Sequence, residues 1–230
     1  FPEVLQGLTL QTGLILSTWQ KLAPFSLMYQ ISASNTTLLV IFGLTSILMG
    51  GWGGLNQTQL RKILAYSSVA HLGWMMLVMQ YKPQLALLTF ITYLALTTPM
   101  FFTLIFTQST TINTLSTSSS KIPIITAMAP LILLSLGGLP PLTGFLPKWA
   151  ILLELTKQDM MTIATMAALS ALLSLYFYLR LSYAMTLTSS PNDIPATLPW
   201  RIITSQNTLL LAASTPMALL MLPISPSALA

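Results

Sequence analysis

Three lysines within apolar segments are the residues whose type and position point most clearly to chemistry. Lys21, Lys62 and Lys148 lie inside or near the start of runs long enough to cross a bilayer. A charged side chain at the centre of a bilayer costs about 2.5–3.5 kcal/mol on insertion scales. Such residues therefore persist mainly in bundle interiors or water-filled cavities, where they mark ion or proton paths. The alternative interpretation of each lysine is an ammonium that snorkels to the membrane surface.

Two of these lysines lie beside sequence that interrupts a helix. Pro24 follows Lys21 by three residues, and Lys148 comes directly after Pro147 and shortly after the run GGLPP at 137–141. Proline removes a backbone donor and clashes with the preceding turn. In lipid, the freed backbone groups must be satisfied by protein or trapped water. We therefore expect Lys21 and Lys148 in discontinuous helices, near the middle of the membrane and facing the bundle interior.

His71 is the one histidine of the chain and a further candidate proton carrier. Imidazole titrates near neutral pH and suits a proton relay. Nine residues separate His71 from Lys62, which places them on opposite sides of a regular helix and about 13 Å apart along its axis. The two residues would share one path only through water or a local irregularity. A histidine that is simply hydrogen-bonded between helices is the other interpretation.

Carboxylates are scarce, and no acidic partner for Lys21 is evident in the sequence. Glu154 and Lys157 are three residues apart near the end of an apolar segment. Oppositely charged side chains at this spacing are neighbours on a helix surface. This pair therefore predicts a salt bridge at the membrane interface rather than a step in a relay.

The composition indicates an integral membrane protein. Of 230 residues, 54% are hydrophobic and only 6% are charged, against about 25% charged in a soluble domain. The net charge of +5 is spread without a basic run, which argues against a nucleic-acid partner. With no cysteine and a single histidine, the chain is not expected to bind an iron–sulfur cluster or a Cys/His zinc site. We expect no cofactor and no metal in this chain.

The apolar segments predict an all-α, polytopic membrane protein with about eight transmembrane helices, two of them discontinuous. We expect residues 1–230 to form a single transmembrane domain, with polar loops near 108–121 and 188–203. Asn56 resembles a helix N-cap, and the tyrosines Tyr176, Tyr178 and Tyr183 are typical of an interfacial belt. The predicted helices span roughly 8–30, 36–55, 57–81, 84–107, 122–138, 141–157, 160–187 and 204–224.

Three stretches closely resemble the chain 2 family of mitochondrial NADH–ubiquinone oxidoreductase, the antiporter-like membrane-arm subunits of respiratory complex I. They are TWQKLAP at 18–24, GGLNQTQLRKILAYSS at 53–68 with HLGW at 71–74, and LGGLPPLTGFLPKW at 136–149. The resemblance extends over essentially the whole chain, which looks like the C-terminal two-thirds of such a subunit. It implies an inverted-repeat antiporter-like fold with discontinuous helices.

The resemblance also implies a function and a set of site residues. It implies a proton-translocating subunit that contributes to NADH-to-ubiquinone electron transfer coupled to proton pumping. Lys21 corresponds to the lysine of the first broken helix, Lys62 to the central lysine, Lys148 to the lysine of the second broken helix and His71 to the histidine of the central helix. The family's glutamate partner of Lys21 would precede Phe1.

The implied setting is the mitochondrial inner membrane, with the lipid bilayer and other complex I membrane-arm subunits as partners. NADH, flavin, iron–sulfur clusters and ubiquinone are expected in other parts of the complex. Two alternatives stay open from the residues alone. One is a stand-alone cation/proton antiporter, and the other is a structural membrane scaffold with vestigial lysines. Composition does not separate the first of these from a complex I subunit.

Overall fold

The computed structural model describes residues 1–31, 36–120, 122–188 and 208–220, and the regular structure in these ranges is helical apart from one isolated bridge. The expected loop near 188–203 and the ends of the expected helix 204–224 lie almost wholly outside the described residues. The helices are α1 (Pro2–Gly7), α2 (Leu10–Thr18), η1 (Trp19–Lys21), α3 (Leu22–Ile31), α4 (Thr36–Gly54), α5 (Leu60–Met79), α6 (Pro83–Thr107), α7 (Ile112–Ser116), η2 (Thr117–Ser120), α8 (Pro123–Gly137), α9 (Phe145–Lys157), α10 (Met161–Thr188) and α11 (Leu209–Leu220).

Within the described residues, four helices are long and apolar enough to cross a membrane. These spans are Thr37–Gly54 in α4, Leu60–Met79 in α5, Pro83–Thr107 in α6 and Met161–Leu187 in α10. A helix of about 20 residues reaches about 30 Å, which matches the hydrocarbon core of a bilayer. The chain is therefore a nearly all-helical, multi-pass membrane protein, as the composition predicts.

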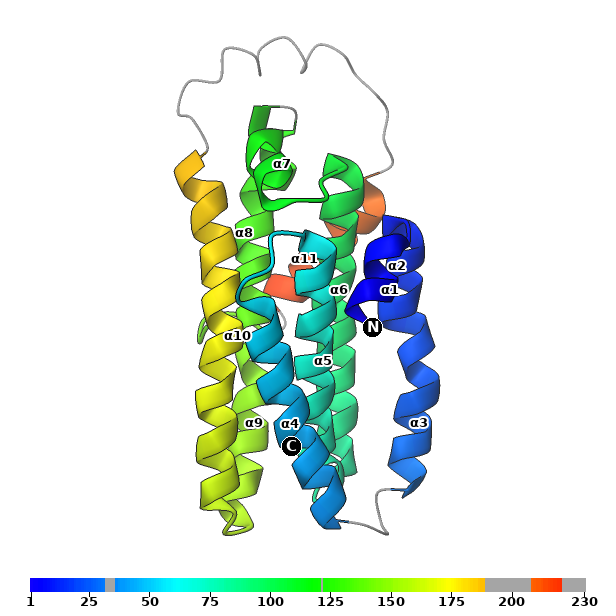
Figure 1. Cartoon of the computed structure of the whole chain (residues 1–230), viewed down its shortest axis with the longest axis vertical. Coiled ribbons are helices and arrows are strands. Elements are labelled where there is room, and N and C mark those ends of the chain that lie inside the picture. The colour runs from blue at the N-terminus through cyan, green and yellow to red at the C-terminus, as the bar shows by residue number, and fades with distance from the viewer. Residues whose placement is uncertain (32–35, 121, 189–207, 221–230) are drawn as a thin grey trace.

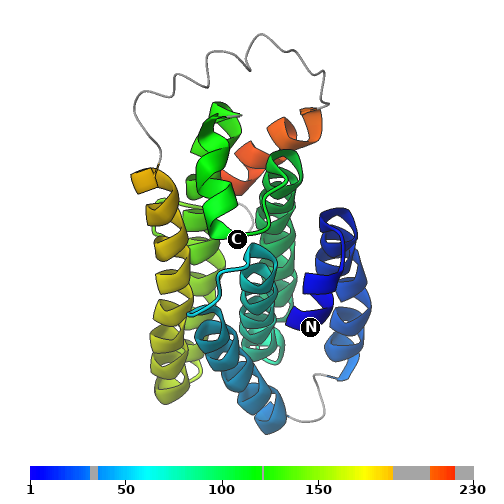
Figure 2. The same ribbon diagram turned by 45° about the horizontal axis from the view of Figure 1, so that its top comes forward.

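The four long helices run along the long axis of the molecule, and two pairs of shorter helices pack beside α5 and α6 (Figure 1). On one side of α5 and α6, α2 leads through the turn η1 into α3. On the other side, α8 leads into α9. Figure 2 shows the same arrangement from a second direction. Each pair therefore places an interruption of regular α-helix beside the central helices, a 3₁₀ turn in one pair and residues 138–144 in the other.

Small residues bring α4 and α5 into close contact. A Cβ at Gly50 would lie 2.7 Å from the backbone nitrogen of Ala70, and one at Gly73 would lie 2.7 Å from the carbonyl of Gly43. Helices in lipid associate through such small residues because the backbones can then pack directly against each other. This contact fixes the position of α5, the helix that carries His71.

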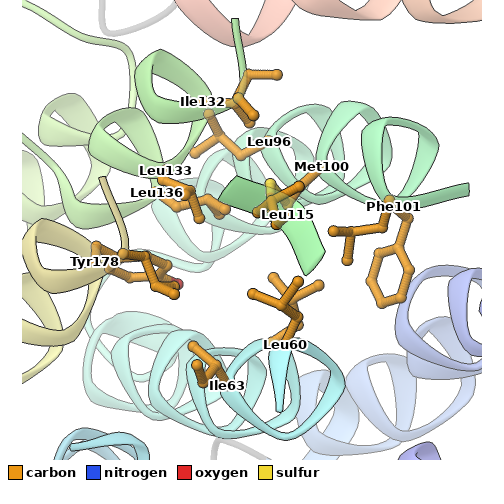
Figure 3. Close-up of a cluster of buried hydrophobic side chains, with 14 of the residues drawn as sticks. Leu60, Ile63, Leu96, Met100, Phe101, Leu115, Ile132, Leu133, Leu136 and Tyr178 are labelled. Carbon is orange, nitrogen blue, oxygen red and sulfur yellow. The ribbon is translucent and has the colours of Figure 1, made fainter. Parts of the chain in front are cut away.

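The buried apolar side chains form two clusters at different heights along the bundle. The upper cluster, as oriented in Figure 1, includes the ten residues labelled in Figure 3, among them Leu60, Met100 and Leu136. The lower cluster includes Phe25 and Trp74. Between the clusters lies a layer of polar side chains, which we call the polar layer: Ser17, Lys21, Ser67, Ser68, His71, Lys148 and Ser174, together with Tyr93, whose ring also belongs to the lower cluster.

The segment 108–121, expected to be a loop, instead contains the short helix α7 and the 3₁₀ turn η2. Thr111 forms a capping box with Thr114, in which each side chain accepts a hydrogen bond from the backbone nitrogen of the other residue. Two hydroxyls thereby satisfy backbone donors that a short helix leaves free. Hydroxyl residues favour helix starts as well as turns, so the polar composition is compatible with a loop that contains a short helix.

The helix expected from residue 57 begins later, at Leu60, and its N-cap is Gln59 rather than Asn56. The cause is a short bridge to the segment before α7. The backbone nitrogen of Leu60 donates to the carbonyl of Thr110, and that of Ile112 donates to the carbonyl of Thr58. These bonds hold the residues before α5 in an extended conformation, so Asn56 lies outside the helix.

The tyrosines of α10 do not all belong to one interfacial belt. Tyr176 and Tyr183 are exposed, whereas Tyr178 is only 1% exposed and belongs to the upper cluster. Residues 176 and 183 are seven apart and share a helix face, but residue 178 is rotated by about 200° from residue 176. The assignment of Tyr178 to the belt was therefore wrong, because helical phase places it in the core.

Candidate functional site

Lys21 is buried in the polar layer, in the 3₁₀ turn that separates α2 from α3. It is the last residue of the turn η1 and is only 5% exposed. Its Nζ donates to the hydroxyl of Tyr93 at 2.8 Å and to the carbonyl of Ser68 at 3.4 Å. The same nitrogen lies 4.4 Å from the centre of the Tyr93 ring, within the range of a cation–π contact. Neutral groups from α5 and α6 therefore solvate this ammonium.

Tyr93 connects Lys21 with His71. Its hydroxyl accepts from Lys21 and donates to the carbonyl of Ser17 at 3.0 Å, so both functions of the hydroxyl are used. Its ring centre lies 5.4 Å from that of His71, with an angle of 46° between the ring planes. Tyr93 from α6 therefore touches both a lysine at a helix break and the histidine of the central helix.

Lys148 lies in the first turn of α9, beside the break that follows α8. Its Nζ donates to the carbonyl of Gly137, the last residue of α8, at 2.8 Å. Gly138 adopts a left-handed conformation with φ of 81°, which ends α8 and is accessible to glycine at little cost. A helix leaves its last carbonyls without intrahelical partners. The lysine of one half-helix thus caps the carbonyl end of the other.

A narrow pocket joins His71 and Lys148. It is lined by side chains from α5, α9 and α10, and it leaves no space for a water-sized sphere in this conformation. The hydroxyls of Ser67 and Ser174 lie in this wall, although both donate to carbonyls of their own helices. The lining residues are Ser67, Ala70, His71, Trp74, Lys148, Ser174 and Tyr178.

The structure brings three of the four expected site residues together and leaves the fourth apart. Lys21, His71 and Lys148 form a row through the polar layer, connected by the Tyr93 ring and by the narrow pocket. Lys62 is partly buried near the start of α5 and is absent from the lining of that pocket. Lys62 and His71 are nine positions apart on α5, which places them on opposite sides of the helix.

Glu154 forms its salt bridge with Lys82, not with Lys157 as the spacing on α9 suggested. The Lys82 Nζ lies 2.9 Å from Oε2 of Glu154. Lys82 directly precedes α6, and the fold brings this end of α6 against α9. Glu154 lies outside the four long spans, and its hydrogen bond with Lys82 lowers its pKa below the usual value. This pair ties two helices together at one end of the bundle.

Sequence reasoning missed Tyr93, the carbonyl of Ser68 and the carbonyl of Gly137 as partners of the lysines. The carbonyls carry no sequence signal, because every residue has one. Tyr93 does carry a signal. Tyrosines of membrane proteins gather at the interfaces, whereas Tyr93 lies near the middle of the 25-residue helix α6. A tyrosine far from both ends of an apolar span indicates a hydrogen-bonding role inside the bundle.

The chain is similar to proteins of known type over nearly its whole length. It is 64% identical over 228 residues to NADH-ubiquinone oxidoreductase chain 2 of Tetraodon nigroviridis, covering 99% of this chain and 66% of the relative. The chain therefore spans about two-thirds of the length of the curated relatives it matches.

Solved structures share the fold. A chain of respiratory complex I from Thermus thermophilus is 26% identical with a TM-score of 0.73, covering 96% of this chain and 53% of that one. A chain of an archaeal respiratory complex, the membrane-bound sulfane sulfur reductase, has a TM-score of 0.81 at 16% identity, covering 98% of this chain and 48% of that one. The second likeness is one of fold alone.

Two family models divide the chain between them. Residues 1–174 match the transmembrane family of NADH:quinone oxidoreductase and Mrp antiporter subunits. Residues 175–229 match the C-terminal family of NADH dehydrogenase subunit 2. Lys21, His71, Tyr93 and Lys148 all fall within the first match. The chain therefore belongs to the NADH:quinone oxidoreductase/Mrp antiporter membrane family, with the C-terminal region of NADH dehydrogenase subunit 2.

Proposed function

We propose that this chain is part of a proton-translocating membrane-arm subunit of respiratory complex I. In this role it contributes to NADH-to-ubiquinone electron transfer coupled to proton pumping. The observation that carries the proposal is the row of Lys21, Tyr93, His71 and Lys148 across the polar layer. Ionisable side chains inside a membrane bundle are costly, and they mark proton paths where they line up.

Lys21, His71 and Lys148 are the proposed proton carriers, and Lys62 is the fourth. Each lysine of the row is solvated by neutral oxygen atoms, which hold an ammonium without fixing it in a permanent ion pair. The narrow pocket between His71 and Lys148 must open or take up water for a proton to pass, because it has no room for water as it stands. A conformational change at this pocket therefore controls transfer between the two residues.

The location and the partner subunits of this chain are also part of the proposed function. The similarity to complex I chain 2 proteins supports the mitochondrial inner membrane as the location and other membrane-arm subunits as partners. Electron carriers and ubiquinone then belong to other parts of the complex, and this chain carries no cofactor of its own. The breaks at η1 and between α8 and α9 support an inverted-repeat fold of about eight transmembrane helices, two of them discontinuous.

Substitution of Lys148 tests the relay. Lys148→Met keeps much of the stem and removes the charge, so we expect assembly to persist and proton pumping to fall. Lys148→Arg keeps the charge but does not release its proton, since the pKa of arginine is above about 12. A relay therefore predicts that arginine fails nearly as badly as methionine. Lys148→Glu reverses the charge and is expected to damage both assembly and activity.

The measurement is proton uptake beside NADH–quinone turnover in assembled complexes that carry each substitution. Lys157→Met is the matched control, because Lys157 is an exposed lysine at the other end of α9. We expect this control to pump normally. Full pumping by the Lys148→Arg variant would show that Lys148 has a structural role only, and the relay would then rest on the other lysines.

A further inference from the structure

The hydroxyl of Tyr93 occupies an unusual position, between a protonatable amine and the backbone of a broken helix. It accepts from Nζ of Lys21 at 2.8 Å and donates to the carbonyl of Ser17 at 3.0 Å. Ser17 lies in the last turn of α2, directly before the 3₁₀ turn η1 that interrupts the helix. Tyr93 is only 1% exposed, so bulk water does not compete for these bonds.

This arrangement depends on the protonation state of Lys21. A charged lysine has three N–H donors and no acceptor, so the tyrosine oxygen can only accept from it. A neutral amine has a free lone pair and accepts a hydrogen bond readily. The single hydroxyl proton of Tyr93 then has two acceptors within reach, the amine and the carbonyl of Ser17. The hydroxyl can donate this proton to only one of the two acceptors at a time.

We infer that Tyr93 is a positioning residue that links the protonation of Lys21 to the break between α2 and α3. With Lys21 charged, Tyr93 donates to Ser17 and ties α6 to the end of α2. With Lys21 neutral, the hydroxyl rotates toward Nζ and releases the carbonyl of Ser17. Tyr93 keeps its own proton in both states, and the proton that leaves Lys21 passes to the next carrier of the relay. This inference rests on the proposed relay function.

The groups that surround the Nζ of Lys21 show how much of its solvation comes from the Tyr93 hydroxyl. From α6 it faces Tyr93, and from α5 it faces the carbonyl of Ser68 and, beyond the Tyr93 ring, His71. The ring of Phe1 lies 5.4 Å from Nζ. Of these groups, the Tyr93 hydroxyl is the partner at the shortest distance. Its removal leaves the ammonium with one longer hydrogen bond, at 3.4 Å, and the two aromatic rings.

Tyr93→Phe tests the inference in the assembled complex. This substitution keeps the ring, its cation–π contact with Lys21 and its contact with His71, and it removes only the hydroxyl. Loss of this acceptor, which lies 2.8 Å from Nζ, disfavours the charged form of Lys21 relative to its neutral form. We therefore expect the alkaline limb of the pH–rate profile of proton pumping to move down by about one pH unit.

Two further variants complete the design. Tyr176→Phe removes a hydroxyl from an exposed tyrosine of α10 and is expected to leave the profile unchanged. Lys21→Met is expected to stop pumping. A Tyr93→Phe profile that superimposes on the wild type, while Lys21→Met still stops pumping, overturns the role of Tyr93 and leaves the relay standing. Full pumping by Lys21→Met overturns the relay role of Lys21 itself.

Assembly yield gives a second measurement if Tyr93→Phe weakens the complex. The inference predicts that the loss of yield is smaller in a Lys21→Met background, because no ammonium is then left without its partner. An equal loss in both backgrounds means that Tyr93 only packs between helices, and it overturns the inference. Such a comparison isolates the interaction between the two side chains.

Discussion

At the scale of single residues, the buried lysines of the polar layer and Lys82 have different kinds of partner. Lys21 and Lys148 donate to a hydroxyl and to backbone carbonyls. Lys82 instead pairs with a carboxylate, that of Glu154. A lysine held by dipoles can lose its proton without leaving a buried anion behind. Loss of a proton from a lysine paired with a carboxylate leaves that anion uncompensated. This difference separates proposed proton carriers from a structural pair.

The Lys82–Glu154 pair yields a prediction about stability and pH. Its distance is 2.9 Å, with the Glu154 side chain 6% exposed and that of Lys82 51% exposed. Because water screens the lysine, we expect Glu154→Gln to destabilise the complex by only about 1 kcal/mol at neutral pH. Lys82→Met should have a similar effect, and the double variant should cost less than the sum. Thermal inactivation of the assembled complex provides the measurement.

The pH dependence of this effect follows from the lowered pKa of Glu154. A carboxyl with a depressed pKa contributes stability above its unfolded-state pKa, and this stability is lost as the pH falls through the folded-state value. The wild type and Glu154→Gln should therefore differ at neutral pH, begin to converge as the pH falls below about 4, near the ordinary pKa of glutamate, and become alike only below the lowered folded-state pKa. A difference that persists in acid would show that the amide perturbs packing rather than an ion pair.

At the scale of elements, the break between α8 and α9 depends on the close approach of two backbones. A Cβ at Gly144 would overlap the carbonyl oxygen of Ser135, two residues before the end of α8. The hydroxyl oxygens of Ser135 and Thr143 lie 3.2 Å apart, and the carbonyl of Ala218 in α11 accepts a hydrogen bond from each hydroxyl. The two half-helices and α11 are thus joined by polar contacts at one point.

Gly144→Ala is expected to open this junction. The added methyl forces α9 away from α8, and overpacking of this kind costs about 1–3 kcal/mol. It should also weaken the bond from Lys148 to the carbonyl of Gly137, so pumping should fall together with thermal stability. Gly7→Ala is the matched control, because a Cβ there meets no atom within 4 Å. If Gly144→Ala and Gly7→Ala behave alike, the close approach of the backbones is not required.

At the scale of the whole molecule, much of the surface is apolar along the bundle. Trp52 of α4 is 75% exposed, and Leu172 of α10 is 60% exposed. A soluble monomer rarely exposes large apolar patches, whereas lipid or neighbouring transmembrane subunits cover them in a membrane protein. These exposed apolar side chains are therefore expected of a protein that is surrounded by lipid or by other transmembrane subunits.

Native electrophoresis of gently solubilised membranes distinguishes the candidate roles of the whole protein. A complex I subunit is expected to migrate with an assembly many times heavier than the chain itself, together with NADH dehydrogenase activity. A stand-alone antiporter would migrate as a monomer or dimer. Migration in the large assembly combined with full pumping after loss of the lysines would instead indicate a structural scaffold.

The sequence by itself determined the class of the protein and most of its helices. Low charge and long apolar runs leave no alternative to a helical membrane bundle, since backbone groups in lipid must be satisfied within each segment. Lysines beside prolines and glycines also marked the candidate site, because a charge within an apolar run is costly enough to require a function. Helical phase along α10 also determines that Tyr178 lies on the side opposite the exposed Tyr176, because the two are about 200° apart.

Only the tertiary structure decided which groups meet. It paired Glu154 with Lys82 across 72 positions of sequence, placed Tyr93 between Lys21 and His71, and set Lys148 against the end of α8. None of these contacts follows from spacing along one helix, because each joins side chains or carbonyls of different elements. Their partners are chosen by how the helices pack, and that packing depends on small residues such as Gly73 and Gly144 and on the two apolar clusters that enclose the polar layer.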